Sequence, residues 1–206
     1  MENKNIRIAI VGLGYVGLPL AGLFAKKYKV IGFDIDKNRV DQLKNGIDNT
    51  NEINSKRLKK VLTNDSLTKG LLLSSETNEI ENADYFIVTV PTPIDKNQKP
   101  DLAPLFKASK LVGNLLKKGS IVIYESTVYP GATEEECVPI LEDYSKLIYN
   151  KEFFVGYSPE RINPGDNKHT VEKIIKVTSG STTTVAKKVD DLYKSVIIAG
   201  SIKATS

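Results

Sequence analysis

Three glycines near the start of the chain constrain its fold more than any other feature of the sequence. Gly12, Gly14 and Gly17 have the spacing G-x-G-x-x-G, and they separate the apolar run Ile6–Val11 from the amphipathic stretch Val16–Lys27. In a strand–turn–helix context, the first glycine permits a tight turn, the second lets the backbone approach a pyrophosphate, and the third lets the helix pack against the strand. The sequence therefore predicts a βαβ unit whose helix N-terminus faces the phosphates of a dinucleotide.

An acidic residue indicates which dinucleotide this turn would bind. Asp34 follows the second apolar run, Val30–Phe33, about twenty residues after the glycine turn. A carboxylate at this place accepts hydrogen bonds from the adenosine ribose hydroxyls and repels a 2′-phosphate. We therefore expect NAD rather than NADP, with Tyr15 and Val16 of the turn among the cofactor contacts.

Short β-branched runs alternate with longer amphipathic stretches along the rest of the chain. Further strands are expected at Tyr85–Val90, Ser120–Tyr124 and Phe153–Val155, and a helix at Leu102–Leu116 with Asp101 as its N-cap. The strand runs are continuously apolar, which is typical of a parallel sheet covered by helices on both faces. The predicted fold class is α/β, a doubly wound, Rossmann-type, mostly parallel sheet.

Composition restricts both the number of domains and the classes of partner. With 206 residues, 40% of them hydrophobic, the chain is expected to form one domain over residues 1–206. The net charge of +4 comes with scattered lysine pairs rather than one basic block, so no nucleic-acid partner is expected. No apolar run could span a bilayer and no signal peptide is recognisable, which predicts no membrane partner and a cytoplasmic location. One cysteine excludes an internal disulfide, and no metal site is expected.

Four later segments share a pattern with a known family. FDIDKNRV, TVPTP, YESTVYPG and GYSPERINPGD follow the glycine turn in an order and spacing that resemble the UDP-glucose/GDP-mannose dehydrogenase family. Together they cover almost the whole chain. The resemblance implies the NAD-binding domain of a nucleotide-sugar 6-dehydrogenase.

The resemblance also implies roles for individual residues on the cofactor side. Arg39 would contact the adenosine end of NAD, where a guanidinium can stack or donate hydrogen bonds. Pro91 and Thr92 would lie along the cofactor at the carboxyl edge of the sheet. Ser126 and Thr127 would help to bind NAD, and Thr127 would also hold an ordered catalytic water.

On the substrate side, the resemblance assigns Glu160 as the general base that releases the product acid. Arg161, Ile162 and Asn163 would line the sugar-nucleotide site. The form PERINPGD, with KVTSG further on, resembles enzymes of UDP-N-acetylhexosamines more than enzymes of UDP-glucose. UDP-N-acetylglucosamine or UDP-N-acetylgalactosamine is therefore the expected substrate class. His169 is expected to be structural or surface-exposed.

The family oxidises the C6 alcohol of the sugar twice, with two NAD molecules, through a thiohemiacetal and a thioester on a cysteine. In the family that cysteine, a lysine and an asparagine lie further along the chain than Ser206. Cys137 stands beside three glutamates, which would raise its thiol pKa, so it is expected to be a buried packing residue. By itself the chain is expected to bind NAD without turnover, as a monomer, whereas the full-length protein would be a homo-oligomer.

Three other interpretations remain open on the sequence alone. The chain could be a non-catalytic NAD-binding or sensing module, or part of a β-hydroxyacid-type dehydrogenase with the same glycine turn. The segments STVYPG and SPERINPGD argue against the second of these. The substrate could also be UDP-glucose or UDP-N-acetylmannosamine. In each nucleotide-sugar case the uronate would serve polysaccharide biosynthesis.

Overall fold

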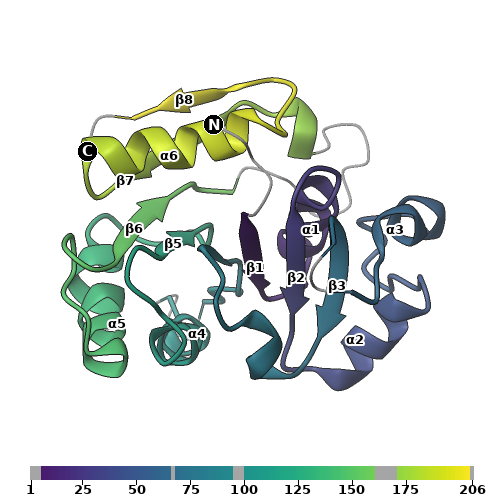
Figure 1. Cartoon of the computed structure of the whole chain (residues 1–206), viewed down its shortest axis with the longest axis horizontal. Coiled ribbons are helices and arrows are strands. Elements are labelled where there is room, and N and C mark those ends of the chain that lie inside the picture. The colour runs from purple at the N-terminus through teal and green to yellow at the C-terminus, as the bar shows by residue number, and fades with distance from the viewer. Residues whose placement is uncertain (1–5, 66–67, 95–99, 161–170, 205–206) are drawn as a thin grey trace.

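The computed structural model describes residues 6–65, 68–94, 100–160 and 171–204. Its strands form one eight-stranded sheet (Figure 1). From one edge to the other, they are β3 (Gly70–Ser74), β2 (Lys29–Phe33), β1 (Arg7–Val11), β4 (Tyr85–Val88), β5 (Ile121–Tyr124), β6 (Phe154–Tyr157), β7 (Lys176–Gly180) and β8 (Ser201–Lys203). The strands from β3 to β6 pair in parallel, while β7 pairs antiparallel with β6. The predicted mostly parallel sheet is confirmed.

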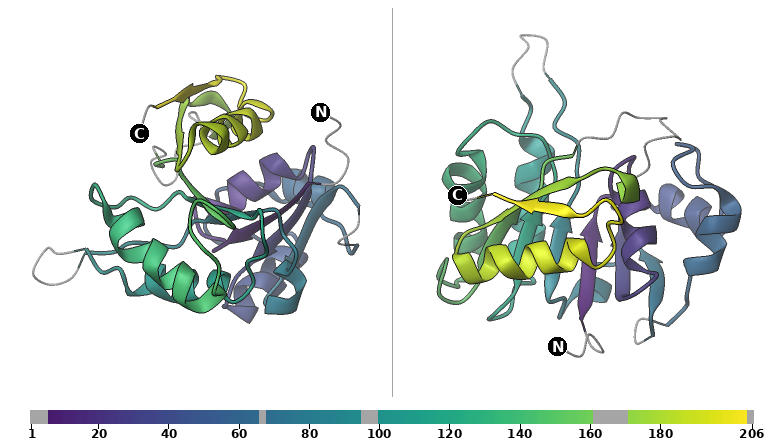
Figure 2. Two further views of the ribbon diagram at one scale, coloured as in Figure 1. Left: turned by 60° about the vertical axis from the view of Figure 1, so that its left-hand side comes forward. Right: turned by 90° about the horizontal axis from the view of Figure 1, so that it is seen from above.

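Helices cover both faces of this sheet. They are α1 (Gly17–Phe24), α2 (Lys37–Lys44), α3 (Ser55–Val61), α4 (Ala103–Gly113), α5 (Val138–Ser145) and α6 (Thr183–Lys194). In β1, Ile8 and Ile10 belong to a core cluster shared with α1 and α6, whereas Ala9 and Val11 belong to a second cluster shared with α4 and α5. Figure 2 shows α5 and α6 on opposite sides of the sheet. The doubly wound fold class is therefore confirmed.

The helices are shorter than the sequence pattern suggested. The first runs over Gly17–Phe24 instead of Val16–Lys27, and the helix expected at Leu102–Leu116 begins at Ala103 and ends at Gly113. The N-cap prediction was wrong by one residue, because Leu102 occupies that position. The Asp101 carboxylate still accepts a hydrogen bond from the backbone N–H of Ala103, at 2.9 Å. It therefore stabilises the turn before the helix rather than the cap itself.

Three strands were not identified from the sequence, namely β3, β7 and β8. In β7 buried and half-buried positions alternate, so the strand lacks the continuous apolar run that marked the parallel strands. The short strand β8 is largely exposed at the edge of the sheet. Both lie beyond the parallel core, and Figure 2 shows them with α6 on one side of the molecule.

Cys137 is completely buried and belongs to the core cluster under α4 and α5. It ends a π-helical turn, Thr133–Cys137, which leads directly into α5. Removal from water raises the pKa of the thiol, and Glu136 and Glu134 add to this effect. The expectation of a packing cysteine is confirmed.

Two further expectations concern the described part of the chain only. No helix there is long and apolar enough to cross a membrane. No cluster of His, Cys, Asp and Glu side chains suited to holding a metal ion occurs among the same residues.

Candidate functional site

A cavity of about 290 Å³ opens at the carboxyl ends of β1, β4 and β5. In open α/β sheets this edge binds ligands, at the point where the strand order reverses. Here β1 continues to β2 on one side and pairs with β4 on the other. The residues that line the cavity are Tyr15, Val16, Thr89, Val90, Pro91, Thr92, Pro93, Glu125, Ser126, Thr127 and Glu160.

Each glycine of the turn occupies a different environment. Gly12 has a φ of +99°, in the region that favours glycine. At Gly17 an added Cβ would lie 1.9 Å from the carbonyl oxygen of Gly12 and 2.4 Å from Oγ1 of Thr89. At Gly14, by contrast, an added Cβ would meet no atom within 4 Å. The fold itself therefore requires the first and third glycines, while Gly14 leaves open space beside the backbone.

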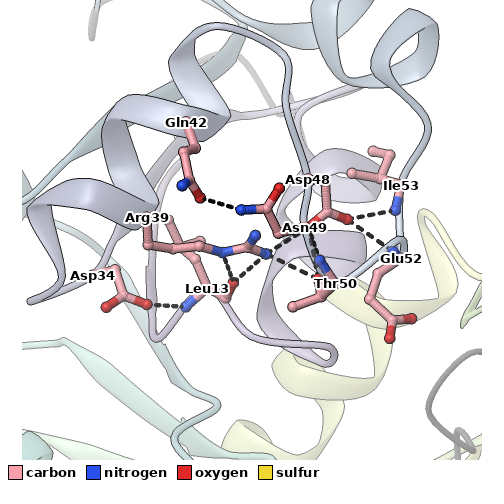
Figure 3. Close-up of polar contacts among 9 residues, drawn as sticks. All are labelled: Leu13, Asp34, Arg39, Gln42, Asp48, Asn49, Thr50, Glu52 and Ile53. Carbon is pink, nitrogen blue, oxygen red and sulfur yellow. Dashed lines mark hydrogen bonds and ion pairs between the residues drawn. The ribbon is translucent and has the colours of Figure 1, made fainter.

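Asp34 is attached to the glycine turn by its own carboxylate. Its Oδ2 accepts a hydrogen bond from the backbone N–H of Leu13 at 2.8 Å (Figure 3). Its Oδ1 accepts one from the N–H of Asp36 at 3.0 Å. A carboxylate oxygen has more than one lone-pair direction, so both oxygens can accept a further hydroxyl. The carboxylate is therefore held beside the glycine turn, and its contact with ribose hydroxyls stays a prediction.

The Arg39 guanidinium joins the turn to the loop that follows α2. Its Nε and Nη2 donate to the carbonyl oxygen of Leu13 at 3.1 and 3.0 Å. The same Nη2 lies 2.8 Å from Oδ1 of Asp48 and 3.0 Å from Oγ1 of Thr50 (Figure 3). Its Nη1 is buried and has no hydrogen-bond partner within the described residues. A contact with adenosine stays a prediction, and the structure adds a role in holding the turn.

Asp48 was not anticipated from the sequence. Its side chain is 1% exposed and accepts hydrogen bonds from the backbone N–H groups of Thr50, Glu52 and Ile53 at 2.8 to 3.1 Å (Figure 3). Desolvation raises its pKa, but hydrogen bonds from Thr50, Ile53 and Arg39 together outweigh that effect and lower the pKa. The bond from the N–H of Thr50 to Asp48 forms an Asx turn, and aspartate is a residue that favours such turns. The presence of an aspartate in this polar loop was the one signal in the sequence.

Hydroxyl groups connect the ends of β4 and β5 across the cavity. The Thr92 hydroxyl donates to the carbonyl oxygen of Thr127 at 2.8 Å, and the Ser126 hydroxyl donates to that of Val90 at 2.6 Å. Thr127 is exposed and lines the cavity, as does Pro91. The structure thus brings four predicted cofactor residues together, with two of their hydroxyls bonded to the backbone.

A buried cluster of ionisable side chains adjoins the cavity, which two of its members, Glu125 and Glu160, line. Lys176 Nζ lies 2.5 Å from Oε2 of Glu125 and 3.4 Å from Oε2 of Glu160. The side chains of these three residues are 1%, 0% and 7% exposed. The hydroxyl of Tyr193, on α6, donates to Oε1 of Glu125. The sequence offered only a weak signal for this cluster, a glutamate directly after the fully apolar strand β5.

Burial and charge act in opposite directions within this cluster. Desolvation raises the pKa of Glu125; the Lys176 ammonium opposes this rise, and Glu160 adds to it. Desolvation would lower the pKa of Lys176, but the charges of Glu125 and Glu160 outweigh it and raise that pKa. Desolvation and Glu125 raise the pKa of Tyr193 well above its usual range. The lysine therefore stays protonated, and two carboxylates share its charge.

The predicted site residues fall into three groups. One group lines the cavity and comprises Tyr15, Val16, Pro91, Thr92, Ser126, Thr127 and Glu160. Gly12, Gly14 and Gly17 form the adjoining turn, and beyond it Asp34 and Arg39 contact Leu13. Arg161, Ile162, Asn163 and His169 lie outside the described residues.

Proteins of known name resemble this chain over nearly all of its length. It is 55% identical over 203 residues to a UDP-N-acetyl-D-glucosamine 6-dehydrogenase of Pseudomonas aeruginosa, and 57% identical over 202 residues to Protein CapL of Staphylococcus aureus. Each alignment covers 98% of this chain and 46% of the relative. The solved structure of a UDP-D-ManNAc dehydrogenase from Pyrococcus horikoshii superposes with a TM-score of 0.84 at 32% identity, covering 96% of this chain and 46% of that one.

The chain thus spans about half the length of the relatives that it matches. Within that half, the model of the UDP-glucose/GDP-mannose dehydrogenase family, NAD binding domain, matches residues 6–197. The match includes the glycine turn, the cavity and the buried cluster. This chain therefore belongs to the UDP-glucose/GDP-mannose dehydrogenase family and carries its NAD binding domain.

Proposed function

We propose that this chain is the cofactor half of an NAD-dependent UDP-N-acetylglucosamine 6-dehydrogenase. The observation that carries the proposal is a single cavity with the glycine turn on one side and Glu160 on the other. The 55% identity to the enzyme of that name from P. aeruginosa supports the substrate. The complete protein would oxidise the C6 alcohol of the sugar to a uronate, for use in polysaccharide biosynthesis.

The residues around the turn fit NAD. The open space beside Gly14 allows close approach of a pyrophosphate to the backbone, and the N-terminus of α1 favours negative charge there. Asp34 can accept hydrogen bonds from the ribose, and the unpartnered Nη1 of Arg39 can donate to a further acceptor nearby. When bound, NAD supplies the hydride acceptor. The protein's part at this end is to hold the cofactor with its reactive ring toward the cavity.

Glu160 and Thr127 fit a role in releasing the product acid. An ionised Glu160 would take a proton from water as that water attacks the acyl group carried by the complete protein. The hydroxyl of Thr127 can both donate and accept a hydrogen bond, so it can orient such a water. Both residues line the cavity, and Lys176 lies 3.4 Å from the glutamate.

The likeness to the P. horikoshii protein favours UDP-N-acetylmannosamine as the second candidate substrate. These two sugars differ in configuration at one carbon, so the discrimination depends on the position of a few polar groups. The higher identity to the glucosamine enzyme supports UDP-N-acetylglucosamine as the first candidate.

Calorimetric titration with NAD and with NADP tests the cofactor part of the proposal. We expect saturable binding of NAD, poor binding of NADP, and weaker NAD binding in Asp34→Asn. If the chain binds neither dinucleotide, the assignment of a working cofactor site in this half fails. Turnover would be measured on the complete gene product as NADH formation, with the UDP-linked N-acetylglucosamine, N-acetylgalactosamine, N-acetylmannosamine and glucose compared. A preference for UDP-glucose would contradict the proposed substrate class.

A further inference from the structure

Glu160 shares its cation with a second carboxylate that lies deeper in the protein. Lys176 Nζ is nearer to Glu125, at 2.5 Å, than to Glu160, at 3.4 Å. Tyr193 binds the other oxygen of Glu125, so that carboxylate is fixed between α6 and β7. Glu125 therefore fixes the position of the lysine, and the same ammonium lies beside Glu160 in the cavity lining.

The three side chains come from segments far apart in sequence. Glu125 follows β5, Glu160 follows β6, and Lys176 begins β7. Each is at most 7% exposed, so water screens their mutual interaction only weakly. A charge that changes on one of them must alter the free energy of ionisation of the others.

We propose that Lys176 and Glu125 are positioning residues for Glu160. The Lys176 ammonium holds the Glu160 carboxyl group in place at the cavity, and Glu125 competes with Glu160 for the same ammonium. The proposal rests on the function proposed above, in which Glu160 acts as a base. In this proposal the cluster affects the position and the ionisation equilibrium of Glu160, in addition to connecting β5 with β7.

Other ionisable groups of the described residues face this cluster as well. On β6, desolvation contributes most to the raised pKa of Tyr157; the charge of Glu125 raises this pKa further and that of Lys176 lowers it. From α6, Tyr193 contacts Glu125, while Asp190 of the same helix pairs with Lys194 instead. Of the groups on the described elements around it, Lys176 is the cation that lies beside Glu160.

Site-resolved titration of the glutamate carboxyl groups by carbon NMR tests the proposal on this chain, without any need for turnover. In Lys176→Met the loss of the cation should raise the pKa of Glu160, increasing its protonation constant by about tenfold or more. In Glu125→Gln the loss of a neighbouring negative charge should lower the pKa of Glu160. Lys176→Arg, which keeps the charge, should restore a value near that of the wild type. A purely structural cluster predicts no such opposite shifts.

If the uncompensated Glu125 charge unfolds Lys176→Met, that single variant gives no Glu160 titration to compare with the wild type. The double variant Glu125→Gln/Lys176→Met removes both charges and leaves an acceptor for Tyr193, so it provides the matched comparison with Glu125→Gln. Glu160 should titrate higher in the double variant than in Glu125→Gln, and equal titration in these two folded proteins would overturn the proposal. Full uronate formation by the complete protein with Glu160→Gln would instead refute the base, and it would leave the titration result unaffected.

Discussion

Two parts of the proposed cofactor site each contain a buried carboxylate paired with a cation, yet the pKa values of the two carboxyl groups shift in opposite directions. Asp48 pairs with Arg39 at 2.8 Å beside the glycine turn, and Glu125 pairs with Lys176 at 2.5 Å next to the cavity. Their side chains are 1% and 0% exposed. Nevertheless the pKa of Asp48 is lowered and that of Glu125 is raised.

The difference follows from the donors around each carboxylate. The loop after α2 turns around Asp48 and directs three backbone N–H groups at it, so its charge is stabilised even without the arginine. Within the described residues, the Glu125 carboxylate accepts hydrogen bonds from the side chains of Lys176 and Tyr193, and a second carboxylate lies close by. Asp48 therefore acts as a fixed anchor for the turn, whereas the charge of Glu125 depends on its neighbours.

The largest effect on stability should come from removing the cation next to the cavity. Lys176→Met leaves a fully buried Glu125 without its opposite charge, which costs about 3 to 5 kcal/mol for a pair of this kind. The free energy of unfolding from urea titration at neutral pH measures this loss. Lys187→Met is the control, since Lys187 is 70% exposed and pairs with Asp191 on the surface of α6. A loss no larger than in that control would show that the buried pair is not needed for stability.

Removal of the other cation should have a smaller effect. In Arg39→Met, Asp48 keeps the three backbone donors, so we expect a loss of about 1 to 3 kcal/mol from the missing charged hydrogen bonds. NAD binding should weaken as well, because Arg39 also holds the carbonyl group of Leu13. Unfolding and calorimetric titration of the same samples check both effects. If Arg39→Met proved as destabilising as Lys176→Met, the contrast between backbone and side-chain donors would be wrong.

The pH dependence of stability should differ in sign between the two carboxylates. The folded-state pKa of Asp48 lies below its ordinary value of 3.8, so its stabilisation is present above pH 3.8 and is lost as the pH falls through the folded pKa. That of Glu125 lies above 4.5, so its contribution is most favourable below pH 4.5 and declines as the pH rises through the folded pKa. The stability difference from wild type, measured against pH for Asp48→Asn and Glu125→Gln, should therefore change in opposite directions. Parallel curves would contradict the assigned pKa directions.

The sequence predicted the parallel part of the fold except for β3, because its signals are local. Continuous apolar runs and the glycine spacing lie within single elements, and β1, β2 and α1 formed where these patterns placed them. The antiparallel β7 was missed because its alternating burial depends on α6, which contacts Thr178 and Gly180. Helix ends were also imprecise, since apolar periodicity continues past the last hydrogen-bonded turn.

The ion pairs of the site lay outside what local patterns can reveal. Glu125 and Lys176 are separated by 51 residues, and their contact exists only because β7 turns back against β6. Arg39 was connected with the cofactor through a family resemblance, which carried no information about Asp48. Burial of a charged side chain is favourable only when a partner compensates it, and the tertiary fold determines which residue that partner is.

Gly14 of the glycine turn has open space beside its backbone, so a change there should have the smallest effect on stability. In Gly14→Ala the new methyl group meets no protein atom within 4 Å, and the free energy of unfolding should change by less than about 0.5 kcal/mol. The same methyl group would occupy space that a bound pyrophosphate needs, so NAD affinity should fall by about tenfold or more. Adenosine, which lacks the pyrophosphate and relies on the side of Asp34 and Arg39, should bind as it does to the wild type. If NAD affinity were unchanged in Gly14→Ala, the pyrophosphate would not approach the backbone here, and the Asp48 side of the site would have to bind the cofactor in another way.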